Sequence, residues 1–374
     1  MMVKKKIDHI LAFYLPQYHP IKENNEWWGV GFTEWTNVVK SKARFRVHRQ
    51  PQIPSDLGFY DLRLAATRAA QAELARQYGI TGFCYYHYWF NGHQLLEQPL
   101  NEVIKTGEPS FPFCVCWANE NWTRAWDGLD RQVLIKQDYT LDDSEAHFFE
   151  LIKYFKDPRY ITIDGRPLFI IYRYDHIPNV KEYFNKWRFL AKENGFPELY
   201  ICAAKNGFIT NSDEKIIELG FDSILDFQPN RNNFPKADSF KQKAITVTKK
   251  ILPDFIYQWL KVNGSAINYI DYEEMVKGII KQKWPSTYCK FPCVFPSWDN
   301  SARRKTPTII QNDKPAVYEN WLTFGINSVQ QYEDGQKIIF INAWNEWAEG
   351  CHLEPDEKMG KTFLESTKKA IDKF

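Results

Sequence analysis

The sequence predicts a (β/α)8 barrel, in which eight parallel strands alternate with helices around one closed sheet. Three observations predict it. Eight short, strongly apolar segments recur along the chain, helical patterns separate them, and each segment is almost continuously hydrophobic. Continuous hydrophobicity is typical of parallel strands that are buried on both faces. A chain of 374 residues is long enough for one such barrel.

The predicted strands follow one another along the whole chain. They cover residues 9–19, 79–90, 111–122, 166–175, 198–206, 221–229, 291–300 and 336–346. The alternative architecture is an open doubly wound sheet, but no glycine-rich phosphate loop follows the first strand. We therefore expect residues 1–374 to form a single barrel domain without an internal repeat or a linker.

Helical patterns lie between these strands. Residues 61–79 are rich in alanine and reach Gly79, a residue suited to a helix end. Residues 144–157 begin at Ser144, which can cap a helix N-terminus. Apolar residues also recur with a helical period in the segments 180–195, 272–282 and 360–374.

Two connections are too long for ordinary loops between a strand and a helix. They cover about residues 20–60 and 230–266. Both leave the carboxyl ends of strands, the face at which barrel enzymes build their sites. We therefore expect these insertions to be lids or walls of a substrate site.

Charge and composition limit the kinds of partner. The chain has 48 Lys and Arg against 46 Asp and Glu, a formal net charge of +2, which argues against a nucleic-acid partner. Aromatic residues make up 16% of the chain, with 14 Trp, 20 Tyr and 27 Phe. Trp and Tyr combine a large flat surface with a polar group, which suits the stacking of sugar rings. The composition therefore favours a carbohydrate partner.

The cysteines and the N-terminus bear on the compartment. Seven cysteines, an odd number, lie mostly in apolar segments, which favours reduced thiols over disulfides and predicts no metal site. The first residues resemble a signal peptide, but Asp8 and His9 interrupt the apolar stretch. No segment approaches the roughly 18 apolar residues of a membrane helix. We therefore expect a cytoplasmic protein with no membrane insertion, metal or cofactor.

Polar and aromatic residues end nearly every predicted strand. A purely structural barrel would not need them there, because buried polar groups without partners cost free energy. We expect these residues to face one shared site at the carboxyl ends of the strands. They are Tyr18, His19, Tyr86, His87, Trp89, Asn119, Glu120, Trp122, Tyr172, Arg173, Asn206, Gln228, Trp298, Asp299 and Asn345.

Some of these residues also have a structural interpretation. Side chains alternate along residues 79–90, so some face the helices, and we expect His87 and Trp89 to face the site. Glu120 could bind a sugar hydroxyl, as could Arg124, or the two could pair with each other at i and i+4.

The loop residues carry similar alternatives. Trp28 and Trp35 are expected sugar platforms that could equally anchor their loop, and Arg303 is expected in a loop that contacts the ligand. The basic positions between Lys40 and Arg49 are expected on a solvated face, with contact to an anionic glycan as the alternative.

The last predicted strand runs into the segment “NAWNEWAEG” and presents two carboxylates three residues apart. In a turn, the Cβ atoms of Glu346 and Glu349 would lie about 5–6 Å apart. That spacing is close to the carboxyl separation of about 5–5.5 Å in retaining glycosidases. Repulsion between such carboxylates raises one pKa, so that one group can act as an acid while the other acts as a base. A solvated pair that caps the next segment is the structural alternative.

Five motifs together resemble a known family. They are “YLPQYHP” with “WWGVGFTEWTNV”, “GFCYYHYWF”, “WANENWTRAWDG”, “FPSWDNSARR” and “FINAWNEWAEGCHLEPD”. The combination spans about residues 8–370 and resembles the WbsX-type domain, a relative of glycoside hydrolase family 99. The resemblance implies a (β/α)8 barrel that cleaves internal α-mannosidic bonds with retention and without a metal, although the sugar and linkage stay open for this chain.

The resemblance also implies roles for three glutamates. Glu346 matches the carboxylate that deprotonates the sugar 2-hydroxyl, which then attacks the anomeric carbon to give a 1,2-anhydro sugar. Glu349 matches the acid that protonates the leaving oxygen and then deprotonates water. Glu34, in “GFTEW”, resembles a glutamate that lines the pocket of the reacting sugar.

Three functions compete. The first is a retaining hydrolase or transglycosylase that acts on α-glycosidic bonds of a bacterial surface polysaccharide or a related glycan. The second is a glycosyltransferase in O-antigen, lipopolysaccharide or capsule biosynthesis, because WbsX-type proteins commonly carry that label. The third is a glycan-binding barrel without catalysis. The intact pair of Glu346 and Glu349 favours the first.

Overall fold

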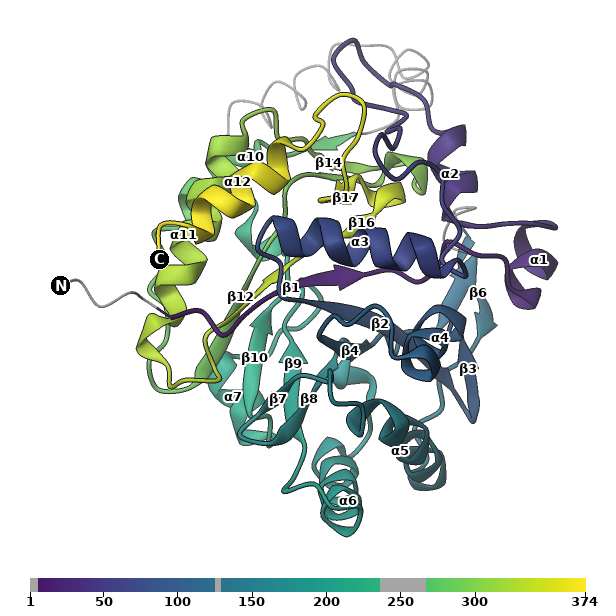
Figure 1. The fold of residues 1–374 in the computed structure, drawn as a ribbon, viewed down its shortest axis with the longest axis vertical. Coiled ribbons are helices and arrows are strands. Elements are labelled where there is room, and N and C mark those ends of the chain that lie inside the picture. The colour runs from purple at the N-terminus through teal and green to yellow at the C-terminus, as the bar shows by residue number, and fades with distance from the viewer. Residues whose placement is uncertain (1–5, 125–128, 236–266) are drawn as a thin grey trace, which may run out of the picture.

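The computed structural model describes residues 6–124, 129–235 and 267–374. Most of the expected insertion at 230–266 and the side chain of Arg124 lie outside the described residues. Eight parallel strands close into a barrel, with helices packed around it (Figure 1). The predicted (β/α)8 fold is therefore confirmed.

The barrel strands match the eight apolar segments of the sequence. In order around the barrel they are β1 (His9–Tyr14), β2 (Gly82–Phe90), β4 (Phe113–Trp117), β8 (Arg166–Ile171), β9 (Tyr200–Ala204), β10 (Ser223–Asp226), β12 (Cys289–Val294) and β15 (Ile338–Ile341). The pairing of β1 with both β15 and β2 closes the ring. Every side chain of β9 and β15 is buried, as expected for strands enclosed on both faces.

The five predicted helices are present. They are α3 (Ala65–Gln77), α5 (Leu141–Phe155), α6 (Val180–Glu193), α10 (Tyr272–Ile279) and α12 (Thr362–Ile371). Their boundaries differ from the predicted ranges by a few residues, and α5 begins three residues before Ser144, the predicted cap. The hydroxyl of Thr140 accepts a hydrogen bond from the backbone N–H of Asp143 (3.1 Å) and caps the helix, and Ser144 lies buried inside it.

Three helices that the sequence did not predict complete the alternation after β2, β9 and β12. They are α4 (Gln98–Thr106), α7 (Asp213–Glu218) and α11 (Pro315–Ser328). α11 gave no clear signal because apolar residues surround much of it and Gly325 interrupts it. Gly325 lies on the side of the helix that faces β12, close to Pro292.

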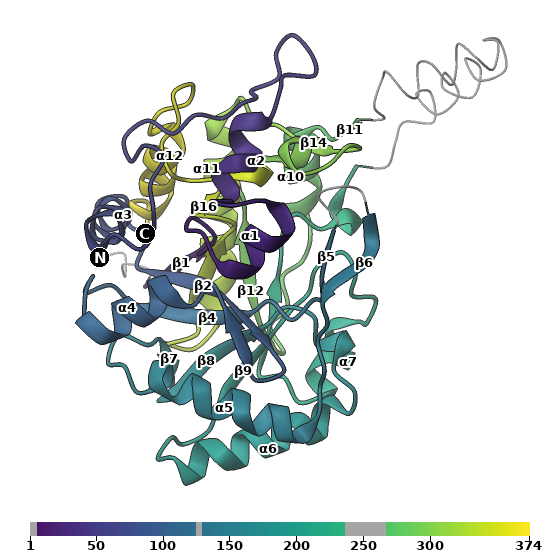
Figure 2. The same cartoon turned by 90° about the vertical axis from the view of Figure 1, so that its right-hand side faces the viewer.

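Short elements surround the carboxyl ends of the barrel strands, toward which Figure 2 looks. The first long insertion forms α1 (Lys22–Trp28) and α2 (Glu34–Lys40). The other short strands at this end are β3 (His93–Leu95), β5 (Trp122–Arg124), β6 (Leu129–Ile135), β11 (Asn268–Tyr269), β13 (Trp298–Asp299), β14 (Thr308–Ile310), β16 (Asn345–Glu346) and β17 (Cys351–His352). At the opposite end, β7 (Thr162–Ile163) pairs with the first residues of β8.

Two general findings concern the described residues. All seven cysteines are buried and none forms a disulfide. Within the described ranges, no helix combines the length and the apolar character needed to cross a bilayer.

Candidate active site

A cavity of about 470 Å³ opens where the strands end. Its wall combines aromatic, acidic and basic side chains contributed by segments far apart in the sequence. The lining residues are Leu15, Gln17, Trp28, Tyr86, Tyr88, Ala118, Glu120, Asn121, Trp122, Thr123, Leu134, Tyr172, His176, Arg303, Arg304, Glu346 and Glu349. A cavity of this size and mixed character suits a small ligand or part of a larger one.

Glu346 and Glu349 both line this cavity. Glu346 ends β16, and a single 3-10 turn, Trp347–Glu349, carries the chain to Glu349. Asn345 fixes the start of this turn against β1. Its side chain accepts from the backbone N–H of Leu15 (2.7 Å) and donates to the carbonyl of the same residue (3.0 Å).

Tyr18 also binds the backbone at the start of this turn. Its hydroxyl donates to the carbonyl of Asn345 (2.5 Å) and accepts from the backbone N–H of Trp347 (3.2 Å). Tyr18 and Asn345 are fully buried and do not line the cavity. Their position therefore supports the two glutamates and does not offer contact with a ligand.

Arg303 brings three glutamates together. Its Nη2 donates to Glu346 Oε1 (2.6 Å) and to Glu34 Oε2 (2.7 Å), and its Nε also reaches Glu34 Oε2 (3.1 Å). Its Nη1 lies 3.1 Å from Glu349 Oε1. Glu34 is fully buried at the start of α2, so the guanidinium joins this helix to the turn after β16.

Burial and charge set the protonation of this cluster. Burial raises the pKa of both Glu346 and Glu349, and the charge of Arg303 opposes that rise. Glu34 raises both pKa values further by repulsion. Because three carboxylates face one guanidinium, a proton retained by one of them relieves their repulsion. The arrangement can therefore hold an acid and a base side by side.

A second buried network supports the turn from the opposite side. Glu354 accepts hydrogen bonds from the Trp347 indole (2.6 Å), the Tyr60 hydroxyl (2.7 Å) and the Gln71 amide (2.7 Å). Burial raises the pKa of Glu354 to about 7, although these donors act against the rise. The sequence did not predict Glu354 as a site residue, because its role depends on partners from distant segments.

On β2 the side chains that face the cavity are not the ones that the sequence predicted. Tyr86 and Tyr88 line the cavity, whereas His87 and Trp89 face α5. The Nε2 atoms of His87 and His147 lie 2.8 Å apart, and the Trp89 indole donates to both oxygens of Asp143 (3.1 Å each). This corrects the expected position of His87 and Trp89, because an apolar strand buried on both faces does not reveal which face is inside.

Some residues of the loop after β1 line the cavity, and others only support the fold. Trp28 lines the cavity. Trp35 instead anchors α2, since its indole donates to the carbonyl of Tyr60 (2.8 Å) and its ring packs against Tyr18 and Trp347. His19 is buried and does not line the cavity, which corrects its expected position.

The ends of β4 and β8 supply one wall. Glu120, Trp122 and Tyr172 line the cavity. Arg173 lies behind them and donates to Glu120 (2.6 Å), so Glu120 pairs with Arg173. Asn119 is fully buried, donates to the carbonyl of Arg173 (2.8 Å) and accepts from its N–H (2.7 Å).

Four further expected residues do not line the cavity. Asn206 donates to the carbonyl of Tyr172 (3.3 Å), and Gln228 is fully buried and donates to Asp226 (3.0 Å). Trp298 and Asp299 form β13, which directly precedes the loop that carries Arg303. The structure therefore places these four residues at the ends of the strands but not in the cavity wall.

Several lining residues were not selected from the sequence. They are Leu15, Gln17, Tyr88, Ala118, Asn121, Thr123, Leu134, His176 and Arg304. Tyr88 could have been found from Tyr86, because residues two apart on a strand share a face. His176 and Arg304 carry no such signal, since His176 ends a 3-10 turn (Tyr174–His176), Arg304 lies in a loop, and the path of both segments depends on tertiary contacts.

Within residues 6–124, 129–235 and 267–374, no group of three or more His, Cys, Asp or Glu side chains is placed to hold a metal ion.

The fold is similar to solved barrels of glycoside hydrolases. A GH99 endo-α-mannosidase from Bacteroides thetaiotaomicron, in complex with bis-tris-propane, matches with a TM-score of 0.55 and 15% identity over 98% of this chain and 97% of that chain. A structure described as a glycoside hydrolase-like protein matches with a TM-score of 0.58 and 12% identity over 99% and 96%. This chain therefore shares the barrel fold of these two structures.

Sequence comparison identifies the family. The model of the family described as Glycosyltransferase WbsX matches residues 10–367. Protein WxcX from two strains of Xanthomonas campestris pv. campestris, described as uncharacterized, is 37% identical over 365 residues. The match covers 97% of this chain and 49% of WxcX, so the chain spans about half the length of these curated relatives. The chain belongs to the WbsX family, which confirms the resemblance carried by its motifs.

Proposed function

We propose that the protein is a retaining glycoside hydrolase that cleaves α-glycosidic bonds in a bacterial surface polysaccharide or a related glycan. One observation carries this proposal. At the cavity, a single guanidinium, that of Arg303, gathers Glu34, Glu346 and Glu349 around it. Such a cluster supports paired acid and base chemistry, and the aromatic wall supports a sugar as its substrate.

In the first step, Glu346 takes the proton of the 2-hydroxyl of the reacting sugar. The 2-oxygen attacks the anomeric carbon while the bond to the leaving oxygen breaks, and Glu349 gives its proton to that oxygen. A 1,2-anhydro sugar and the departing part of the glycan result. The attack comes from the face opposite the leaving group, so the 2-hydroxyl and the leaving oxygen must be trans to each other.

In the second step, water opens the 1,2-anhydro ring. Glu349, now ionised, takes a proton from the water, and Glu346 returns its proton to the 2-oxygen. The anomeric carbon is inverted twice, so its configuration is retained overall. These roles rest on the motif resemblance, and the contacts of Arg303 support them because they hold both carboxylates at one wall of the cavity.

Sugar transfer is the second candidate, and the description of the family favours it. The same carboxylate pair would serve transglycosylation if a sugar hydroxyl replaced water in the second step. A transferase that uses a nucleotide sugar would instead need a site for the nucleotide, and the assay below distinguishes this case.

The test is a product assay with a panel of bacterial surface polysaccharides and α-mannans, with EDTA present and without nucleotide sugar. We expect shortened glycans from the wild-type protein. Glu346→Gln and Glu349→Gln should each lower kcat/KM by a factor of about 10² to 10⁴, the usual contribution of a general acid or base. Glu365→Gln, which changes an exposed glutamate on α12, is the matched control.

An activated substrate separates the two roles. A glycoside with a nitrophenolate leaving group needs no proton in the first step, so Glu349→Gln should still release it in the first turnover, whereas Glu346→Gln should not. Product formation only after a nucleotide sugar is added would contradict hydrolysis and support a transferase.

A further inference from the structure

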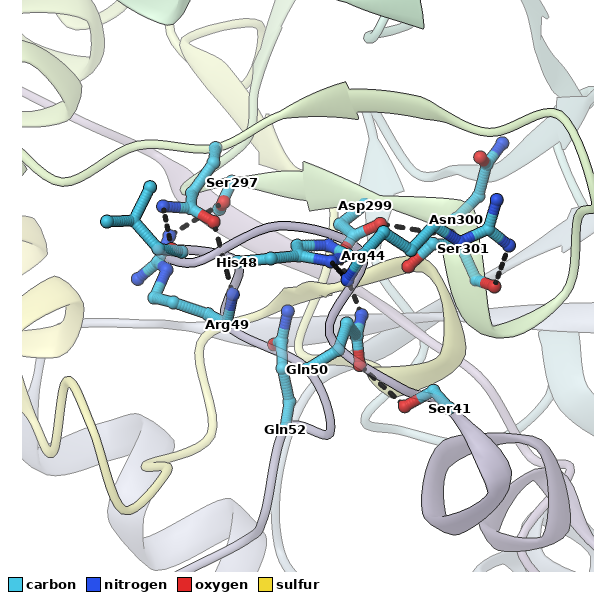
Figure 3. A network of polar contacts seen from close by, with 12 residues as sticks. Ser41, Arg44, His48, Arg49, Gln50, Gln52, Ser297, Asp299, Asn300 and Ser301 are labelled. Carbon is cyan, nitrogen blue, oxygen red and sulfur yellow. Dashed lines mark hydrogen bonds and ion pairs between the residues drawn. The ribbon is translucent and has the colours of Figure 1, made fainter. Parts of the chain in front are cut away.

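The segment 41–52 contacts residues 297–301, the stretch of chain that leads to Arg303 (Figure 3). We call Arg44, His48 and Gln50 the clamp. The sequence suggested that the basic residues of this segment lie on a solvated face. Arg46 is exposed, but Arg44 donates hydrogen bonds into the protein, more than 250 positions away along the chain.

Arg44 binds the backbone on both sides of Arg303. Its Nη2 donates to the carbonyls of Ser301 (3.1 Å) and Arg304 (2.7 Å), and its Nη1 donates to the carbonyl of Lys305 (2.7 Å). A planar guanidinium with several fixed donors can satisfy three carbonyls of one bend at once. The path of the chain at Arg303 therefore depends on this side chain.

His48 and Gln50 fix the beginning of the same loop. His48 Nε2 and Gln50 Nε2 each lie 2.7 Å from Asp299 Oδ2, and Asp299 Oδ1 accepts from the backbone N–H of Ser301 (3.0 Å). The backbone N–H of Arg44 donates to His48 Nδ1 (3.0 Å), so the proton of the neutral ring lies on Nε2 and points at Asp299.

The turn that carries Glu346 and Glu349, the two proposed catalytic residues, also packs against Asp299. Gly350, directly after Glu349, has a φ of +56°, and a Cβ there would lie 2.7 Å from Gln52 Nε2 and 2.9 Å from Asp299 Cβ. Only glycine fits this conformation and this space without strain. Asp299 is thus in contact with the clamp, through His48 and Gln50, and with the turn, through Gly350.

We propose that Arg44 is a positioning residue that, through the backbone of residues 301–305, holds the Arg303 guanidinium against Glu34, Glu346 and Glu349. The inference rests on the proposed function for its consequence in catalysis. The geometry of the clamp does not rest on it, because every contact named above lies within the protein.

Loss of Arg44 should raise the pKa of both Glu346 and Glu349. The charge of Arg303 lowers the pKa of both Glu346 and Glu349, while burial and Glu34 raise it. Arg304 also lowers the pKa of Glu349. If Arg303 moves away, the remaining groups push both pKa values up.

The first experiment needs no substrate. The full chain is labelled with carbon-13 at the glutamate carboxyls and titrated by NMR, with Glu346→Gln and Glu349→Gln assigning the two signals. Arg44→Ala should raise their midpoints by more than about half a pH unit, whereas Arg46→Ala, which removes the same charge from an exposed neighbour, should leave them unchanged. Equal midpoints in Arg44→Ala and wild type would overturn the inference.

The second experiment uses the glycan that the wild-type protein cleaves. Arg44→Ala should lower kcat more than it changes KM, by at least about tenfold, and should move the acid limb of the kcat/KM profile to higher pH. A change in thermal stability with an unaltered pH profile would mean a merely structural role. If the wild type cleaves nothing, the proposed function fails while the NMR titration still decides the position of Arg303.

Discussion

At the scale of single residues, the balance of charge around Arg303 decides what Glu346 and Glu349 can do. One cation and three carboxylates form a buried cluster with excess negative charge when all are ionised. Burial raises the pKa of the two proposed catalytic glutamates, and Glu34 raises it further. Glu34 is thus a second means, besides Arg303, by which the protein adjusts their protonation.

Glu34→Gln should therefore act in the opposite direction to Arg44→Ala. The new amide oxygen can still accept from Arg303, but the negative charge is gone. We expect the pKa of Glu346 and Glu349 to fall, so the acid limb of the kcat/KM profile moves to lower pH by more than about half a unit. The glutamate titration described for Arg44 measures the same change without substrate.

Glu26→Gln is the control, since it removes an exposed carboxylate from α1. If the acid limb of Glu34→Gln moved to higher pH instead, the displacement of Arg303 would outweigh the loss of repulsion between Glu34 and the other two glutamates.

At the scale of elements, the inner face of β2 could not be chosen from the sequence. Both faces of the strand carry aromatic residues and are mostly buried, so periodicity alone does not separate Tyr86 and Tyr88 from His87 and Trp89. Packing against α5 decides it, because His147 on that helix offers His87 a partner (2.8 Å) and stacks on Trp89. The sequence did predict β2 itself and the other seven strands of the barrel.

This histidine pair predicts a pH dependence of stability. Burial lowers the pKa of His87 to about 3 and that of His147 well below its ordinary value, whereas unfolded histidine titrates near about 6.5. The unfolded chain therefore binds more protons below about pH 6.5, and stability is lost as the pH falls from there toward about 3. Each ring contributes on the order of 1 kcal/mol per pH unit once the histidine of the unfolded chain is mostly protonated.

The free energy of unfolding, measured in urea between pH 7 and pH 5, should fall less steeply in His147→Gln than in wild type. His9, His19 and His352 also have lowered pKa values, but they contribute to both proteins, so the difference isolates the pair. Parallel slopes would show that the pair is not neutral in the folded state or that acid reaches it without unfolding.

At the scale of the whole molecule, closure of the barrel brings the site together. Glu34 follows β1, Arg303 follows β12, and Glu346 and Glu349 follow β15, which pairs with both β1 and β12. The three segments are neighbours around the ring although about 310 residues separate the first from the last. A site built this way forms only in the folded chain.

The proposed mechanism predicts the stereochemistry of the product. NMR of the first sugar released should show the anomeric configuration of the substrate, because the anomeric carbon is inverted twice. A glycan whose reacting sugar lacks the 2-hydroxyl should not be cleaved. Release of the opposite anomer would exclude a 1,2-anhydro intermediate, and cleavage without a 2-hydroxyl would exclude Glu346 as the base for it.

The sequence by itself determined the eight strands, the five helices with clear periods and the pair of carboxylates at the end of the last strand. It could do so because apolar runs, helical periods and the spacing within one short turn are local properties. It also determined the family, because the motifs that define it are continuous stretches of chain.

Only the tertiary structure decided which side chains enter the cavity and what holds them. Arg303 meets Glu34, Glu346 and Glu349, Arg44 binds the loop around Arg303, and His87 turns away from the site. Each of these facts depends on contacts between segments that are distant along the chain. A buried charge or ring is placed by the partners that the folded barrel brings to it, and no local pattern in the sequence records those partners.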